Sequence, residues 1–318
     1  MALGGGTFLT QNKVLPGAYI NFVSAAKASA TLSDRGYAAM GIELDWGPEN
    51  QIFEVTNGDF QKNSLKMFGY DYTAAQLKGL RDLFINLSTL YAYRLTSGGT
   101  KAENTYATAK YCGTRGNSLK VVIAANADEE EKFDVSLYID DVTLLDQQVG
   151  ISTAAELIDN DYVVWKKEAS LAADAGLALS GGTNGTVNGA AHQAFLDKAE
   201  AYSFNILGCA STDDTVKKLY VSYTKRMRDE VGAKFQLVAH KTEADYEGVI
   251  SVENEVKESP VSSLVYWVTG AEASCAVNAS LLNKKYDGEF TVKADYTQSQ
   301  LEGFIEDGKF AFHNVSGE

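Results

Sequence analysis

Cysteine and histidine are scarce in this chain of 318 residues, which has three of each. The cysteines, Cys112, Cys209 and Cys275, are widely spaced and form no CxxC pair, which argues against a disulfide framework and against a zinc site. We expect free, buried thiols in a reducing cytoplasm. The histidines show neither HExxH nor HxH spacing, so the sequence predicts no metal site and no metal cofactor.

Long apolar runs and an excess of basic charge are missing as well. No apolar stretch approaches the ~18 residues that a membrane span needs. The N-terminus lacks the basic and apolar regions of a signal peptide, so we expect a protein made and folded in the cytoplasm. Lys and Arg total 28 against 42 Asp and Glu, a formal net charge of −14. Such a chain repels phosphate backbones, so nucleic acid is not an expected partner, and without a long apolar run a membrane is not expected either.

The remaining composition is that of a globular protein. Hydrophobic residues make up 45% and charged residues 22% of the chain, both ordinary values. The length fits one large domain or two ordinary ones.

Residues 1–20 are interpreted as a flexible N-terminal arm. Three consecutive glycines, Gly4 to Gly6, hold no fixed conformation alone, and Pro16-Gly17 marks a turn. A short strand over residues 18–23 is expected to follow.

The segments 21–97 and 190–318 together predict an α/β core. In the first segment we expect a strand over 38–46, a helix capped by Thr73, and a strand over 91–95. The apolar stripe of that helix is Leu77, Leu80, Phe84 and Leu87. In the second segment the predicted helices are 190–202, 213–231, one from Pro260 and 298–305, and the predicted strands are 204–207, 234–238, 248–252 and 309–312. Such alternation indicates a mostly parallel sheet covered by helices.

Residues 98–189 are interpreted as an inserted, mainly antiparallel β domain. Phe133, Val135, Leu137 and Ile139 alternate with polar residues, which is typical of a strand with one wet face. Further strands are predicted at 119–125, 142–145 and 162–165. The acidic run from Asp128 to Glu131 lacks calcium-loop spacing and is interpreted as a solvated hairpin tip.

No motif predicts catalysis. The chain has no GxSxG elbow, no P-loop and no GxGxxG fingerprint. His240, expected after a strand, is interpreted as a solvated loop histidine, with a general base in an α/β hydrolase-like or subtilisin-like enzyme as the alternative. The glycine-rich loop 181–189 is interpreted as a turn into the next helix. Its alternative is an anion cradle of a flavodoxin-like binding module, which requires the loop to open a helix at the carboxyl end of the sheet.

Several stretches, taken in order, resemble the contractile tail sheath proteins of bacteriophages and phage-tail-like particles. They are Pro16-Gly-Ala-Tyr-Ile-Asn-Phe22, Arg35-Gly-Tyr-Ala-Ala-Met-Gly-Ile with Asp45-Trp-Gly-Pro48, Phe68-Gly69 with Tyr93-Arg-Leu95 and Gly98-Gly-Thr-Lys-Ala102, and Leu179-Ser-Gly-Gly182 with Asn184-Gly185 and Phe204-Asn-Ile-Leu207. The chain is similar to the compact branch found in PBSX-type defective prophages and in R-type bacteriocins, such as the clostridial diffocins.

The resemblance implies a non-enzymatic structural subunit without a cofactor. Such subunits polymerise around an inner tube and contract to drive that tube through a target cell envelope. The implied partners are other sheath subunits, the inner tail tube and the baseplate. The implied location is the bacterial cytoplasm during assembly and then the tail of a released phage or bacteriocin particle. The implied core has a subtilisin-like but non-catalytic topology.

The resemblance also implies that arms from neighbouring subunits add strands to one another's sheets. The matching arm residues are Leu9, Val14, Leu15, Pro16, Tyr19, Ile20 and Phe22. Family members run on beyond the point that corresponds to Glu318, so this chain resembles a version without the C-terminal arm. We therefore expect a mainly monomeric protein with an exposed sheet edge.

Overall fold

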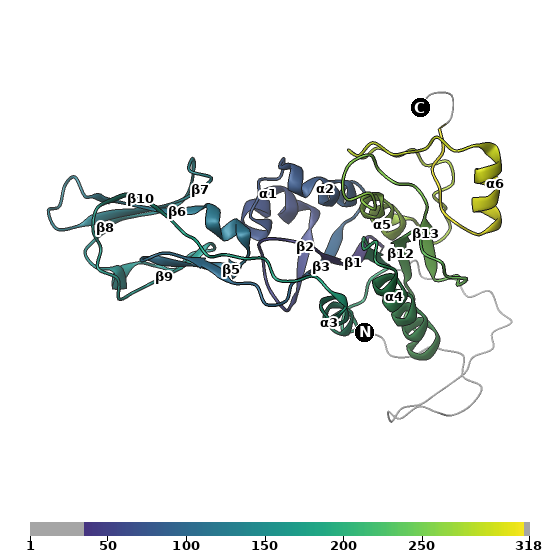
Figure 1. The fold of residues 1–318 in the computed structure, drawn as a ribbon, viewed down its shortest axis with the longest axis horizontal. Coiled ribbons are helices and arrows are strands. Elements are labelled where there is room, and N and C mark those ends of the chain that lie inside the picture. Colours follow the sequence, from purple (N-terminus) through teal and green to yellow (C-terminus); the bar gives the residue numbers. More distant parts are fainter. Residues whose placement is uncertain (1–34, 315–318) are drawn as a thin grey trace.

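A computed structural model describes residues 35–314. The arm residues between Leu9 and Phe22 lie outside this range. The described chain is a mixed α/β protein, with an elongated β-rich lobe at one end of an α/β body (Figure 1).

The body is built on a six-stranded sheet with the order β13-β12-β11-β1-β3-β2. All neighbouring strands are parallel except β2 and β3, which are antiparallel. Almost all of the central strand is buried, as expected for a strand covered on both faces. The strand bounds are β1 Tyr37–Ile42, β2 Ile52–Thr56, β3 Thr89–Arg94, β11 Ile206–Cys209, β12 Gln236–His240 and β13 Val249–Val252.

Helices cover both faces of this sheet. Helices α1 (Asn57–Phe68), α2 (Lys78–Phe84) and α5 (Leu264–Ser274) pack on one face, and α3 (Gly189–Ala199) and α4 (Asp214–Arg226) pack on the other (Figure 1). Alternate residues of β1 enter the two cores, since Met40 joins the first cluster and Ala39 joins the second. A parallel sheet between helices is therefore the frame of the molecule.

The lobe consists of two antiparallel sheets. One has the order β4-β5-β9 and the other has the order β10-β6-β7-β8. Alternating apolar residues of β6 and β7, such as Val121 and Leu137, form a third core between the sheets. The bounds are β4 Lys101–Glu103, β5 Ala107–Cys112, β6 Leu119–Ala125, β7 Phe133–Ile139, β8 Thr143–Ile151, β9 Val163–Trp165 and β10 Asp174–Ala178.

Several expectations about individual elements are wrong. Thr73 caps no helix, because a 3₁₀ turn over Ala75–Leu77 comes first and Leu77 is the N-cap of α2. The four stripe residues are nevertheless all buried. Helix α5 begins at Leu264 and not at Pro260. The predicted strand 309–312 is reduced to one parallel bridge between Phe310 and Val252.

The last helix, α6, spans Gln298–Glu306 and begins with a capping box of Thr297 and Gln300. None of its residues is buried. No helix within residues 35–314 is long and apolar enough to cross a membrane.

Candidate functional site

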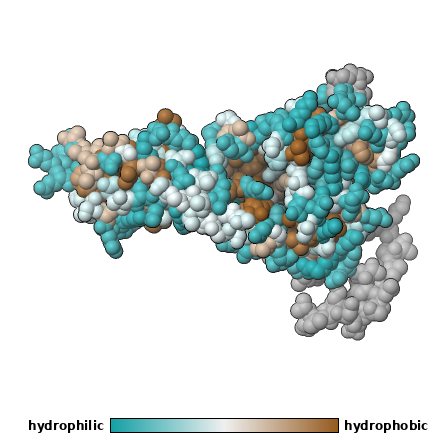
Figure 2. All heavy atoms as spheres, in the orientation of Figure 1, coloured by the Kyte–Doolittle hydropathy of each residue, from teal (hydrophilic) through white to brown (hydrophobic). Residues whose placement is uncertain are grey.

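A cleft of about 1030 Å³ opens where the carboxyl ends of β1, β3 and β11 meet. Figure 2 shows it as a hollow between α2 and α3, with hydrophobic side chains on its walls. Strand β3 lies on one side of β1, whereas the later strands β11, β12 and β13 follow one another on its other side, so the order of the strands reverses at β1. Ligands of α/β sheets bind at such a switch point. The cleft is therefore the candidate site for binding or catalysis.

The histidines in and near the cleft do not form a catalytic pair. Nδ1 of His192 lies 2.9 Å from the hydroxyl of Tyr220, and both side chains are buried. Burial lowers the pKa of His192, so the ring is neutral at pH 7. The hydrolase hypothesis required a Ser or Asp about 3 Å from a histidine. Among the described residues, His192 bonds to a tyrosine instead, and Nδ1 of His240, the residue considered as the base, has no partner, so the structure gives that hypothesis no support.

The interpretation of His240 as a solvated loop histidine is wrong. His240 is the last residue of β12 and is only 4% exposed. Its Nδ1 has no hydrogen-bond partner. Burial first, and then the charges of Lys241 and Lys217, lower its pKa to about 4. The strand continues farther than the sequence indicated, and this carries the ring into the interior.

The glycine-rich loop has the position that an anion cradle requires but not its chemistry. It leads from β10 into α3 and lines the cleft, as the turn interpretation predicted. Asn188 already caps the helix by accepting from the N–H of Ala191. Asn184 accepts from the N–H of Thr114. The cleft walls carry four carboxylates, of Glu43, Asp45, Asp213 and Glu258, against the single ammonium of Lys78, which disfavours an anion.

A buried arginine joins the body to the lobe, and sequence reasoning missed this role. Arg94, at the end of β3, is fully buried. Its Nε donates to the carbonyl of Leu44 at 2.9 Å, and its Nη1 donates to Gly47 at 3.1 Å and Cys112 at 2.8 Å. One guanidinium thus binds the segment after β1 to the end of β5. A charged residue in an otherwise apolar strand was the available signal.

A second arginine completes this junction. Nε of Arg115 donates to the carbonyl of Gly69, and the guanidinium stacks 4.4 Å from the ring centre of Tyr70. The Tyr70 hydroxyl donates to Asp45, and burial, followed by this bond, raises the pKa of Tyr70. The lobe is therefore held to the body by hydrogen bonds and charge as well as by apolar packing.

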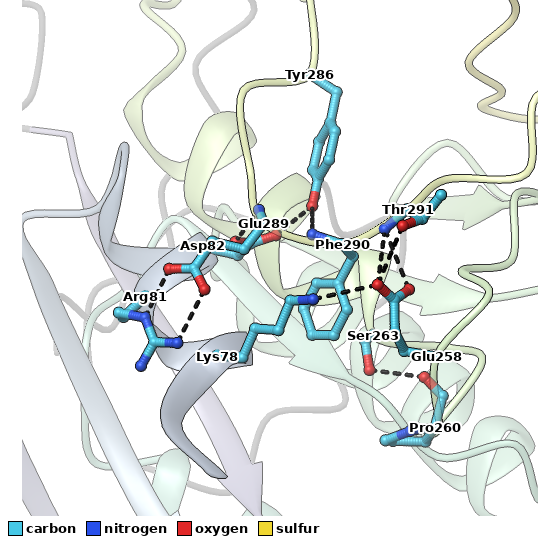
Figure 3. A network of polar contacts seen from close by, with 10 residues as sticks. All are labelled: Lys78, Arg81, Asp82, Glu258, Pro260, Ser263, Tyr286, Glu289, Phe290 and Thr291. Carbon is cyan, nitrogen blue, oxygen red and sulfur yellow. Dashed lines mark hydrogen bonds and ion pairs between the residues drawn. The ribbon is translucent and has the colours of Figure 1, made fainter. Parts of the chain in front are cut away.

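A polar network on α2 lies beside the cleft and reaches its wall through Lys78, Glu258 and Phe290 (Figure 3). The buried carboxylate of Asp82 accepts from the N–H of Glu289 at 2.8 Å and from the hydroxyl of Tyr286. Arg81 binds Glu289 through two nitrogens, at 2.6 and 2.8 Å. Burial raises the pKa of Asp82, although the two donors oppose this. These contacts hold the segment of Tyr286 and Glu289 against α2.

The other half of the network centres on Glu258. Its carboxylate accepts from the N–H of Thr291 and lies 3.2 Å from Nζ of Lys78. Partial burial raises its pKa, but backbone hydrogen bonds and Lys78 outweigh this and lower the pKa to about 2. Lys78 also lies 4.5 Å from the ring centre of Phe290. Figure 3 shows the carboxylates of Asp82 and Glu258 facing the segment that carries Tyr286, Glu289 and Thr291.

The acidic run and the three cysteines lie outside the lining of the cleft. The acidic run Asp128–Glu131 lies at the exposed turn between β6 and β7, as predicted. Residues 35–314 contain no group of side chains suited to hold a metal ion. Cys112 and Cys209 are buried, but Cys275 is half-buried, which corrects the expectation of three buried thiols.

Comparison with known proteins matches nearly all of the described chain to phage tail sheath domains. Residues 35–95 match the N-terminal region of domain III of the tail sheath protein Gp18. Residues 97–184 match the phage tail sheath β-sandwich domain, and residues 185–318 match the central domain. Two Bacillus subtilis (strain 168) proteins, the phage-like element PBSX protein XkdK and the uncharacterized protein YqbK, are each 30% identical over 98% of this chain and 72% of their own length.

Solved structures agree with these matches. The sheath tail protein of Desulfitobacterium hafniense is 35% identical, with a TM-score of 0.83 over 95% of this chain and 72% of that chain. A sheath tail protein of Listeria innocua is 31% identical, with a TM-score of 0.74 over 89% of this chain and 66% of that chain. The fold is therefore that of a sheath tail protein.

The chain belongs to the phage tail sheath family. Its role is structural, as part of a phage tail, and membership implies assembly with other sheath subunits.

Proposed function

We propose that this protein is the subunit of a contractile sheath, which polymerises around an inner tube and shortens to drive the tube through a target cell envelope. The observation that carries the proposal is the similarity to sheath tail proteins along both the body and the lobe. The inner tube and the baseplate are the further partners, and assembly takes place in the bacterial cytoplasm before the particle is released.

The division of the chain proposed from the sequence is retained, with an arm over residues 1–20, a core of 21–97 and 190–318, and an inserted domain over 98–189. The separate sheets of body and lobe support this division. The proposed topology of the core is subtilisin-like and non-catalytic. The run of parallel strands on both sides of β1, together with the tyrosine partner of His192, supports that proposal.

We further propose that the arm residues Leu9, Val14, Leu15, Pro16, Tyr19, Ile20 and Phe22 add a strand to a neighbouring subunit. A heterologous contact of this kind repeats without closing and builds a helical tube. The body offers an edge for such pairing, because β2 is the last strand of the six-stranded sheet.

Negative-stain electron microscopy and sedimentation test the sheath proposal. Two proteins are compared, the chain of 318 residues and the same chain extended by a C-terminal arm of the family type. We expect tubes from the extended protein and predominantly monomers from the chain of 318 residues. Monomers from both proteins, at every salt concentration and with an inner tube supplied, would contradict the proposal.

A further inference from the structure

The chain after α5 lies on the body, where Tyr286 and Phe312 cover the buried ring of Trp267. No residue from Cys275 to Asn314 is buried, whereas eight residues of α5 are. From Lys284 to Tyr296, half-buried and exposed residues alternate without a break. A period of two is typical of an extended chain with one face against the protein. Residues 284–296 are called the strap below.

Three backbone amides of the strap donate to side chains, two of which belong to the body. The N–H of Glu289 donates to Asp82, and the N–H of Thr291 donates to Glu258. Between them, the N–H of Phe290 donates to the hydroxyl of Tyr286, which itself donates to Asp82. Three consecutive amides thus depend on side chains, two of which are carboxylates (Figure 3).

Backbone pairing of the strap with the body is confined to its centre. The N–H of Lys257 donates to the carbonyl of Thr291, and the N–H of Lys293 donates to the carbonyl of Glu255. A single antiparallel bridge joins Val256 and Val292. A segment paired over so few residues lacks the cooperativity of a strand within a sheet.

Two ion pairs at the strap are partly exposed to water. The Arg81 and Glu289 side chains are 12% and 44% exposed, and those of Lys78 and Glu258 are 25% and 35% exposed. Because solvent screens these charges, such pairs add little to the free energy that holds the strap against the body. Tyr286 and Phe290 pack on the first core cluster but remain only partly buried.

We propose that the strap is a detachable cover, which opens as a unit from α2 and from Trp267 of α5, the contact of Tyr286 and Asp287, while the six-stranded sheet and α5 stay folded. Elements with few buried contacts are those that open at free energies below that of global unfolding. Glu258 and Phe290 both line the cleft, so opening of the strap changes one wall of the cleft. The proposal does not depend on contraction, since it concerns the isolated subunit.

Hydrogen exchange measured by mass spectrometry tests this proposal on the 318-residue chain. The variant Glu258→Gln/Tyr286→Phe keeps the shape of both side chains but removes a charge and a hydroxyl. We expect peptides covering 284–296 to exchange at least tenfold faster in the variant, with peptides from α5 and β11 unchanged within twofold. The matched control is Glu200→Gln, which removes an equally exposed partner of Arg226 on the other face, and it should leave the strap unchanged.

Two results would overturn the proposal. One is acceleration of α5 to the same degree as the strap, because the opening would then be global. The other is no acceleration of the strap. If the double variant does not fold, exchange of the unaltered chain at low urea concentrations decides the question. Strap amides should then show little dependence on urea and sheet amides a steep one, and an equally steep dependence would refute the inference.

Discussion

The guanidinium of Arg115 binds the carboxylate of Asp140 with two nitrogens, each 2.6 Å from a different oxygen. Arg115 follows β5, and Asp140 lies in the turn after β7, so this pair connects the two sheets of the lobe. Its third contact, with Gly69, reaches the body. One side chain therefore fixes three parts of the molecule.

Arg115→Lys should lower the free energy of unfolding by about 1–2 kcal/mol, because an ammonium cannot reproduce the bidentate geometry and also bond the carbonyl of Gly69. Asp140→Asn should cost less than about 1 kcal/mol, since the Asp140 side chain is half exposed and Asn tolerates its positive φ. Urea unfolding measures both changes. Arg226→Lys, in a single-bonded surface pair, is the control and should stay within about 0.5 kcal/mol of wild type. An equal effect of all three changes would contradict the assigned role.

Gly113→Ala should destabilise the protein by more than about 3 kcal/mol. A Cβ there would lie 1.9 Å from the carbonyl oxygen of Asp45 and 2.8 Å from Nη2 of Arg94, at a φ of +127°. Gly98→Ala is the matched control, because its φ is also positive but nothing lies within 4 Å of the new Cβ. It should cost about 1 kcal/mol. Thermal unfolding of the two variants compares them, and similar midpoints would show that the junction is not close-packed at Gly113.

His240 should make the protein less stable as the pH falls. Its pKa is lowered to about 4 in the folded chain, while the unfolded chain has an ordinary value of about 6.5. The unfolded state therefore binds the proton more readily, and the free energy of unfolding decreases between about pH 6.5 and pH 4. The slope from this group is at most ~1.4 kcal/mol per pH unit.

His240→Gln should flatten that part of the stability curve, and His313→Gln, at an exposed position, should not. Chemical denaturation at a series of pH values gives both curves. Parallel curves for wild type and His240→Gln would show that the ring is protonated equally in both states.

Thiol labelling of the native protein should modify Cys275 first. Cys112 and Cys209 are buried, and burial raises the pKa of Cys209 to about 12, so its reactive thiolate is absent at neutral pH. Ellman's reagent should therefore titrate about one thiol rapidly and the other two only after unfolding. Rapid reaction of a Cys275→Ser variant would contradict this order.

Strong periodicity made some elements predictable, whereas weak local signals hid others. The strands 119–125 and 133–139 have the predicted bounds. One face of each strand is directed to solvent and the other to the core, so polar and apolar residues alternate clearly along the sequence. Helix α1 was not predicted, since its first residues, Asn57-Gly-Asp59, have low helix propensity and tertiary burial of Phe60 and Phe68 stabilises it.

The junction and the strap's contacts were beyond sequence reasoning for a different reason. Arg94 and Cys112 meet through a backbone carbonyl, which leaves no pattern in the residue types. Asp82 and Glu289 lie 207 residues apart and meet only because the chain returns to α2. Contacts of this kind depend on the completed topology, and no local window contains both partners.

The place of β1 between β3 and β11 constrains the order in which the protein can form during translation. Tyr37 of β1 donates its N–H to the side chain of Asn205, 168 residues later. A ribosome that has released β1, β2 and β3 must still synthesise the whole lobe before β11 emerges. During that interval the nascent sheet presents the open side of β1, a bare apolar edge that invites pairing with other chains. Rapid folding of the lobe, or a chaperone bound to that edge, would shorten or shield this exposure, so yield in cells should respond to translation speed across residues 95–205.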